Sequence, residues 1–444
     1  MAGAGRKSGA LAPWLLLAVL FLAFACSSLD RLIVGLLIEP IKVSLHASDT
    51  EIGMLQGFAF LLVYGVAGLP AGYLADRARR TWLVALAIAV WSLMTSLCGL
   101  ATHYWSLFLA RAGVGVGESA LSPASYSLIA DSFPQRRQGL ALSIYTCGAT
   151  TGAGLSLMAG GYVVAWFNAR GPLELFGLGL LQPWQLTFMA LGLPGLAVAL
   201  LVLLLREPSR AIADPGEVSP TVGGFTRFFA RNRWTLGFHH LAAGACNVVV
   251  LASTSWTATL LIRVHGWNVA RIGLTVGLAT LVGGMAGLLV GGWASDLAFR
   301  RGPHVRLVFC AVAAAAGALA GFAFPMAGAP IVAVVLYGVV LMCAVAAFAS
   351  ANAALQFLVP GQVRGLASAV YFLSFSVVGS AGPVLVALAS DRLFPFRTGI
   401  RFSLALVDCG GFAAAAVAYV LATASYRRKA GEDGAAREAA VQRG

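Results

Sequence analysis

Long apolar segments alternate with short polar loops along the whole chain. A helix needs about 20 mostly apolar residues to cross the hydrocarbon core of a bilayer, and twelve segments of the chain meet this requirement. They are residues 13–38, 50–75, 82–101, 105–130, 138–166, 184–205, 234–262, 269–295, 305–325, 330–356, 362–390 and 399–424. The longest polar loop, 206–233, falls after the sixth segment. The pattern therefore predicts an all-α integral membrane protein with twelve transmembrane helices, six on each side of this loop.

Composition supports a membrane protein. Of the 444 residues 59% are hydrophobic and only 11% are charged, against roughly 25% charged residues in soluble domains. So few polar residues cannot cover a soluble fold of this size, which excludes a soluble enzyme, a disordered chain and a coiled coil. The first apolar segment follows Arg6 and Lys7 like a signal peptide. It is longer than the roughly 7–15 residues of a signal-peptide core, so we expect an uncleaved first helix.

The net charge of +13 comes mainly from short loops on one side of the predicted helices. Of the 30 lysines and arginines, 21 lie on the side that holds both termini and 7 lie on the other side. This bias is typical of the positive-inside rule. It predicts a multi-pass protein of the inner (plasma) membrane with both termini in the cytoplasm. We expect no nucleic-acid partner.

Few sequence features indicate chemistry beyond transport. The seven cysteines all lie in apolar segments, without C-x-x-C spacing, and we expect free thiols and no metal site. His239 and His240 lie near the start of a predicted helix and are expected at the membrane interface. No phosphate-binding loop and no hydrolase motif is present, so we expect neither ATP-driven transport nor an enzyme, and no cofactor.

The two halves of the chain repeat a motif. Gly72, Asp76 and Arg80 follow the second predicted helix, and Gly292, Asp296 and Arg300 follow the eighth at the same offset. The repeat predicts two pseudo-symmetric six-helix bundles, an arrangement found in many secondary transporters. The expected parts are an N-terminal bundle (1–205), a cytoplasmic linker loop (206–233), a C-terminal bundle (234–425) and a flexible cytoplasmic tail (426–444).

The first of these loops resembles the signature loop of the major facilitator superfamily, G-x-L-a-D-r-x-g-r-[rk]. Arg79 and Thr81 depart from that pattern. Residues 29–31, 111–119 and 205–208 resemble the spinster branch of the superfamily. The resemblance implies the MFS fold and a proton-linked carrier of lysolipids or sphingoid lipids. The segment 111–119 is also similar to the organic anion–cation symporters, which are the alternative.

Four ionisable residues lie inside predicted helices of the first half: Asp30, Arg31, Arg111 and Glu118. A charged residue at a helix centre costs about 2.5–3.5 kcal/mol, so we expect these residues to pair. Helical rise places Asp30 and Arg111 at similar depth, which predicts that they interact, with Glu118 about 10 Å deeper. The set is interpreted as a proton-coupling network, in which Glu118 carries the proton and Asp30 is its partner in the relay. A static ion pair between two helices is the alternative.

The signature loops are interpreted as a gate. Their glycines would let helices approach closely. Their aspartates would pair with arginines or with a helix amino terminus across the two halves on the cytoplasmic side. Ordinary positive-inside charge is the alternative. The gate residues are Gly72, Asp76, Arg77, Arg80, Gly292, Asp296 and Arg300.

Uncharged polar residues in the predicted helices are candidates for lining a substrate cavity. They are Gln56, Tyr64, Tyr145, Asn247, Ser255, Trp256, Asn352, Gln356 and Tyr371. Asp408 is a lone carboxylate in the second half, either a second proton site or a hydrogen-bonded helix contact.

Together these features predict a monomeric, proton-driven secondary transporter that works by alternating access on an amphipathic small molecule. An organic anion–cation symporter is the alternative within the superfamily, and a membrane-embedded enzyme is the alternative outside it. The partners that we expect are the substrate, protons and the lipid bilayer.

Overall fold

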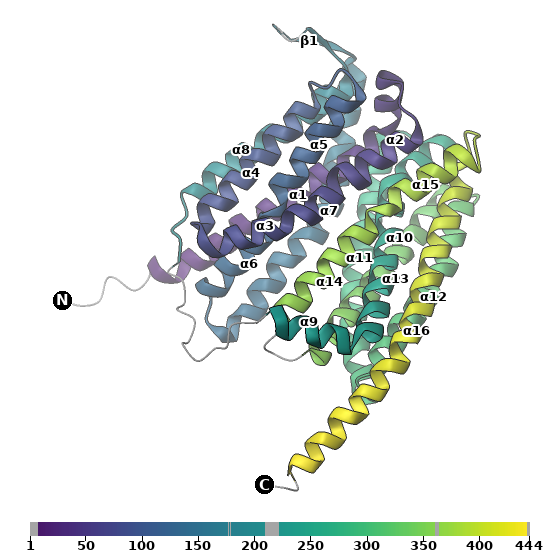
Figure 1. The fold of residues 1–444 in the computed structure, drawn as a ribbon. Helices are drawn as coiled ribbons and strands as arrows, with labels where there is room; N and C mark the ends of the chain where they lie inside the picture. The colour runs from purple at the N-terminus through teal and green to yellow at the C-terminus, as the bar shows by residue number, and fades with distance from the viewer. Residues whose placement is uncertain (1–7, 176, 178, 209–221, 360–363, 442–444) are drawn as a thin grey trace, which may run out of the picture. The chain divides into compact units, whose positions relative to one another are not determined.

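A computed structural model of the protein describes residues 8–175, 177, 179–208, 222–359 and 364–441, and Figure 1 shows its fold. The side chains of some residues within these ranges, Asp76 and Arg364 among them, are not described. The described chain is helical apart from loops and one hairpin, in which β1 (Leu173–Leu175) pairs antiparallel with β2 (Gly179–Leu181). The chain forms two compact units.

Unit 1 comprises residues 1–213 together with 254–281, which belong to two later helices. Its helices before the linker are α1 (Ser8–Leu45), α2 (Asp49–Met54), η1 (Leu55–Leu62), α3 (Val63–Arg77), α4 (Arg80–Cys98), α5 (Tyr104–Ser119), α6 (Leu121–Ser132), α7 (Gln135–Arg170) and α8 (Pro183–Leu203).

Unit 2 comprises residues 214–253 and 282–444. Two helices, α10 and α11, therefore contribute to both units. The helices from the linker onward are α9 (Val222–Arg231), α10 (Arg233–His265), α11 (Val269–Arg300), α12 (Val305–Met326), α13 (Pro330–Leu358), α14 (Arg364–Gly379), α15 (Ala381–Arg392) and α16 (Ile400–Val441).

Ten described helical segments are long and apolar enough to cross a membrane. The predicted span 105–130 corresponds to α5 and α6, which are separate helices that meet at Ala120. The predicted span 138–166 corresponds to α7. Neither is among the ten. An all-helical membrane architecture is thus confirmed, and the number of twelve remains a prediction.

Corresponding helices pack together in the two units. In unit 1, α4 packs extensively against α5 and α8. In unit 2, α12 packs extensively against α13 and α16. In the numbering of the predicted spans, α4 is the third span and packs against the fourth (α5) and the sixth (α8). In the same way, α12 is the ninth span and packs against the tenth (α13) and the twelfth (α16). The same pairing in both units is what the repeat in the sequence predicts.

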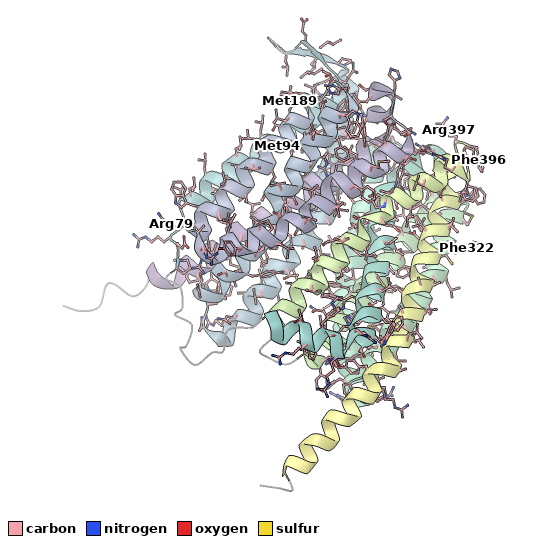
Figure 2. All side chains as sticks on the ribbon, viewed as in Figure 1. Arg79, Met94, Met189, Phe322, Phe396 and Arg397 are labelled. Atoms are coloured by element: carbon pink, nitrogen blue, oxygen red, sulfur yellow. The ribbon has the colours of Figure 1, made fainter. Side chains whose placement is uncertain are left out.

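Large apolar side chains are exposed on both units. Leu109 of unit 1 is 69% exposed. In unit 2, Phe322 and Phe396, labelled in Figure 2, are 56% and 51% exposed. Soluble proteins rarely expose large contiguous apolar patches. Such side chains are suited to lipid tails, which do not penalise them as water does.

Two local features show how the sequence sets the helix positions in unit 1. Ser48 caps α2, because its hydroxyl accepts from the Glu51 N–H while the Glu51 carboxylate accepts from the Ser48 N–H. This reciprocal pair satisfies two N–H groups that a helix start leaves free.

Gly161 of α7 faces Gly273 so closely that an added Cβ would lie 2.8 Å from the Gly273 Cα. Only glycine allows this approach, as is typical of membrane helix contacts.

Candidate functional site

Arg31 of α1 and Glu118 of α5 form an ion pair in unit 1, with Nε and Oε2 2.6 Å apart. The Glu118 side chain is fully buried, whereas the Arg31 side chain is 29% exposed. The guanidinium of Arg31 also lies over the ring of Tyr64, 4.8 Å from its centroid. One end of the pair is therefore sealed in protein while the other is accessible.

Arg111 is buried beside this pair and reaches α1 through the backbone. Its Nη1 donates to the carbonyl oxygen of Asp30 over 2.9 Å. The predicted approach of Asp30 and Arg111 is present, but it joins the guanidinium to a carbonyl and not to the carboxylate. Among the described residues, the ion pair of this cluster is Arg31–Glu118.

Three atoms of the cluster have no hydrogen-bond partner among the described residues. They are Oδ1 of Asp30, Oε1 of Glu118 and Nε of Arg111. A buried polar atom without a partner costs about 1–3 kcal/mol, and more when it is charged. The cluster thus places two carboxylates next to two arginines. The carboxylate of Glu118 forms an ion pair with Arg31, whereas that of Asp30 forms none among the described residues. A proton or an anionic group could relieve this cost.

The π-helix η1 supplies an aromatic wall that the sequence did not predict. Its Phe60 ring lies 5.4 Å from the Arg31 guanidinium and 4.9 Å from that of Arg111. Gly115 of α5 makes room for η1, because a Cβ there would lie 2.7 Å from the Phe60 carbonyl oxygen. π-helical turns are frequent at functional sites. Nothing in the apolar sequence around Phe60 indicates the extra residue in this turn.

Unit 1 also holds five of the predicted cavity residues. Gln56 and Tyr145 are buried, with the Gln56 Nε2 and the Tyr145 hydroxyl unpartnered among the described residues. Tyr64 contacts Arg31, as described above. Ser255 is buried, and Trp256 is fully buried.

The remaining four cavity candidates lie in unit 2. Gln356 donates to Asn352 and to Ser368, and Asn247 donates to the Phe375 carbonyl. These bonds satisfy polar groups between helices and do not by themselves indicate a ligand site. Tyr371 is buried in an aromatic cluster described next.

The two histidines of α10 are buried inside unit 2, and their expected position at the membrane interface remains a prediction. His239 and His240 are 3% and 6% exposed, and both rings lie within 6 Å of the Tyr371 ring centroid. They are buried because α10 already carries apolar packing at its start, where Leu236 is also buried. Among the described residues, no group of side chains could hold a metal ion.

Asp408 of α16 is fully buried and accepts a hydrogen bond from the Ser253 hydroxyl of α10 over 2.8 Å. This contact is the interhelical hydrogen bond that one of the two interpretations requires. The other carboxylate oxygen of Asp408, Oδ1, has no hydrogen-bond partner among the described residues. A role as a second proton site remains a prediction.

Arg80 is buried inside unit 1, where the gate interpretation expects a partner across the two halves. It pairs with Asp131 at the end of α6 and with Glu207, 3.3 Å from Nε. Its Nη2 donates to the Pro208 carbonyl. Burial alone would raise the pKa of the Glu207 carboxyl, but the hydrogen bonds from Arg80 and Thr81 outweigh it and hold that pKa below its usual value. Arg80 thus joins three chain segments within one unit.

The other gate residues are placed less tightly. Asp296 is 84% exposed and lies 3.8 Å from Arg306, Arg300 is exposed, and Arg77 stacks on Tyr73. The expected close helix approach at Gly72 and Gly292 is not found among the described residues, since an added Cβ would meet nothing within 4 Å. The side chain of Asp76 lies outside the described residues.

A second ion-pair cluster in unit 1 was missed by sequence reasoning. Arg263 of α10 binds Asp49 through both Nη atoms, at 2.6 and 2.7 Å, and Glu39 through Nε at 2.7 Å. Lys42 also pairs with Asp49. From the sequence alone, Lys42 and Arg263 are counted only as loop charges. The acidic residues Glu39 and Asp49, which lie close to Lys42 in the sequence, are the feature that could have indicated an ion-pair cluster.

Replacing Arg263 tests what this cluster contributes. Arg263→Ala is expected to destabilise the protein by about 1.5–3 kcal/mol, the range for hydrogen bonds to charged groups, since Lys42 still pairs with Asp49. The apparent unfolding temperature of purified protein measures it. Arg271→Ala is the matched control, because Arg271 is exposed and stacks on Trp267. Equal shifts in the two variants would contradict a structural role for the cluster.

The family of the chain follows from a model that spans both units. The family model of the Major Facilitator Superfamily matches residues 20–383. The chain belongs to the Major Facilitator Superfamily. As a member of the superfamily it is a transporter and not an enzyme.

Similar proteins agree with this assignment. An MFS-type efflux pump of Mycolicibacterium smegmatis is 28% identical over 427 residues, 95% of each chain. The sphingosine-1-phosphate transporter SPNS2 of Danio rerio is 27% identical over 308 residues, 64% of this chain and 57% of the relative. The crystal structure of a bacterial homolog of the human lysosomal transporter Spinster matches the fold with a TM-score of 0.77. The two are 24% identical, and the match covers 96% of this chain and 98% of the other. The resemblance to spinster proteins is confirmed.

Proposed function

We propose that this superfamily member is a proton-coupled secondary active transporter that works by alternating access. In this proposal, α5 with α6 and α7 supply the two membrane spans beyond the ten described candidates. Both termini face the cytoplasm, and the protein acts as a monomer in the plasma membrane without a cofactor. The proton gradient drives the cycle.

The observation that carries the proposal is the buried charge cluster of unit 1. Glu118 is sealed at 0% exposure while its partner Arg31 is 29% exposed. A movement of Arg31 would leave a buried carboxylate without its cation, and the charged form would then be disfavoured. Arg31 can thus link substrate binding to protonation of Glu118.

For the substrate we propose an amphipathic molecule with an anionic or polar head, such as a lysolipid or a sphingoid lipid. The exposed side of Arg31 offers a cation, and the ring of the partly exposed Tyr64 offers apolar surface beside it. The relative SPNS2 is named as a sphingosine-1-phosphate transporter. A small organic anion is the alternative, since the same arginine would bind a carboxylate.

Proteoliposomes with a pH-sensitive dye inside test the proposal. We expect a substrate-dependent pH change for at least one member of a panel of lysophospholipids and sphingoid phosphates, absent from liposomes without protein. A response to small organic anions only would favour the alternative substrate class. Movement of an amphiphile without any pH change would reject proton coupling.

The gate interpretation gives a separate prediction. If Asp76 and Asp296 hold the cytoplasmic side closed, Asp76→Asn and Asp296→Asn are each expected to favour the inward-open state. Alkylation of a cysteine introduced at a cavity position, Asn352→Cys, would then rise in inside-out vesicles. Vesicles without Asn352→Cys report the background from native thiols. Unchanged labelling in both aspartate variants would refute the latch.

A further inference from the structure

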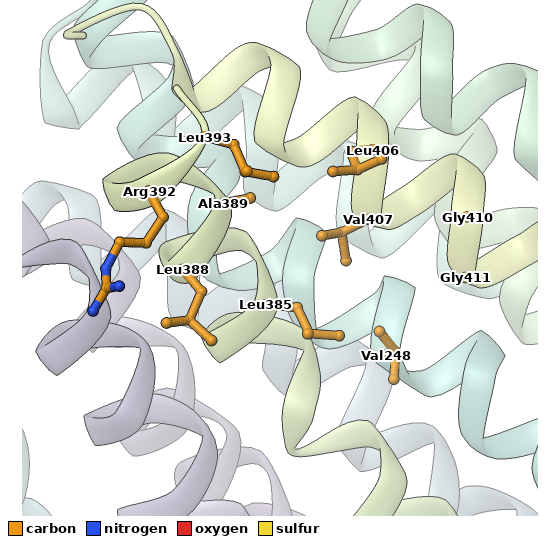
Figure 3. A pocket seen from close by; sticks show the side chains of 10 residues that line it. All are labelled: Val248, Leu385, Leu388, Ala389, Arg392, Leu393, Leu406, Val407, Gly410 and Gly411. Atoms are coloured by element: carbon orange, nitrogen blue, oxygen red, sulfur yellow. The ribbon is translucent and has the colours of Figure 1, made fainter. Parts of the chain in front are cut away.

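An apolar groove of about 480 Å³ lies on unit 2 between α10, α15 and α16. Ten residues line it, and Figure 3 shows them. Val248, Ala389 and Val407 are at most 9% exposed and form the floor. Leu385 and Leu406 are 44% and 51% exposed and form walls on α15 and α16. The volume lies within the roughly 300–1,000 Å³ of ligand pockets.

Glycine keeps part of this groove free. An added Cβ at Gly410 of α16 would meet no atom within 4 Å, so this position opens into free space. The neighbouring Gly411 has no such room, because a Cβ there would lie 2.7 Å from a methyl group of Val249. Gly410 is therefore a position where a larger side chain can fill the groove without disturbing the helix contact.

One charged residue lines the groove. Arg392, at the end of α15, is exposed, and no acidic side chain pairs with it among the described residues. In Figure 3 its guanidinium extends away from α16, while Leu393 beside it remains on the apolar side. Arginines near helix ends commonly hold the charge at the polar boundary and leave the stem along apolar surface. A headgroup bound by Arg392 would thus lie beside the groove and a hydrocarbon chain would lie within it.

We propose that this groove binds one membrane phospholipid with an anionic headgroup, with an acyl chain along the α15–α16 walls and the phosphate at Arg392. The apolar lining excludes a wholly polar ligand, and the cation selects for negative charge. Arginine binds phosphate oxygens through two parallel hydrogen bonds. This lipid site is separate from the charge cluster of unit 1 and does not depend on the proposed transport function.

Native mass spectrometry of the purified protein, titrated with phosphatidylglycerol or phosphatidylcholine, tests the site. Both lipids carry the phosphate, but the choline ammonium of phosphatidylcholine offsets its charge and is repelled by Arg392. We therefore expect one phosphatidylglycerol to bind about tenfold more tightly than phosphatidylcholine, a difference of about 1.4 kcal/mol. Arg392→Ala should remove this preference, while Arg397→Ala should retain it. Arg397 is a matched control because it is also an exposed arginine of unit 2, and Figure 2 labels it.

A second variant tests the acyl chain. Gly410→Leu fills the groove and should weaken both lipids by a similar factor. Gly237→Leu in α10 is its control, since a Cβ there also meets nothing within 4 Å. Equal binding of the two lipids, or identical behaviour of Arg392→Ala and Arg397→Ala, would overturn the proposal. If Gly410→Leu abolishes transport while leaving phospholipid binding unchanged, the groove belongs to the substrate path and the lipid assignment is wrong.

Discussion

Glu118→Gln is expected to abolish accumulation driven by a pH gradient while substrate still binds. The glutamine keeps the shape of the side chain and can still accept a hydrogen bond from Arg31, but it cannot carry a proton. If proton and substrate binding are linked, their coupling is worth about 1–3 kcal/mol, which is a 5- to 150-fold change of substrate affinity on protonation. Glu118→Gln should remove this pH dependence of binding together with the accumulation. Uptake into proteoliposomes with and without a pH gradient measures this directly.

The controls for Glu118→Gln separate coupling from folding. Glu174→Gln changes an exposed carboxylate of the β1–β2 hairpin and should leave accumulation unchanged. Arg111→Ala should weaken substrate binding as well, because it removes a buried cation next to Asp30. Full pH-driven uptake by Glu118→Gln would make the Arg31–Glu118 pair structural. Asp408 would then be the next candidate for the proton site.

Arg80→Ala is expected to give the largest loss of stability. It leaves Asp131 and Glu207 facing an empty space from which a 1%-exposed cation has been removed. Breaking such a buried pair from one side typically costs about 3–5 kcal/mol. Arg80→Lys should recover only part of this, because lysine lacks the planar fork that serves several acceptors at once. Thermal unfolding of the purified protein in detergent measures both variants.

The neighbouring arginine provides the matched control. Arg79 is 73% exposed, lies 3.9 Å from Glu207 and projects outward in Figure 2, so Arg79→Ala should change stability by less than about 0.5 kcal/mol.

The pH dependence of the unfolding free energy provides a second measurement. The lowered pKa of Glu207 means that its stabilising contribution is present above the unfolded-state pKa, about 4.3, and is lost as the pH falls through the folded value. Arg80→Ala should flatten this part of the stability profile. Equal effects of the two alanine variants would show that Arg80 does not join the segments.

The sequence predicted which charged residues gather in unit 1 but not how they pair. Helical rise gives the depth of a residue along its helix, and on that basis Asp30 and Arg111 were correctly expected to meet. Depth does not give rotation about the helix axis. Asp30 and Arg31 are adjacent and point about 100° apart, and it is Arg31 that faces Glu118. Nor does a sequence pattern reveal that Arg111 would bind a carbonyl oxygen and not a side chain.

The remaining features depend on contacts that no local pattern encodes. The π-helical turn that brings Phe60 to both arginines lies in an ordinary apolar segment. Arg263 and Asp49 are 214 residues apart, so their bond arises only when distant helices pack. Arg80 is part of a motif that suggested a gate, yet burial places it within its own unit. Span lengths predict the class of fold well, because each span must satisfy the bilayer by itself.

The shared helices of the two units bear on how the protein could be divided. Duplication of an ancestral six-helix gene would suggest a natural cut after Pro208, giving two separately made fragments. Residues 254–281 lie beyond that cut but belong to unit 1. The first fragment alone would lack Arg263 opposite Asp49 and the glycine surface that Gly161 packs against. The amino-terminal fragment would thus be an incomplete folding unit, because residues 254–281 of unit 1 belong to the other fragment. Co-expression should be required before the amino-terminal fragment becomes resistant to protease.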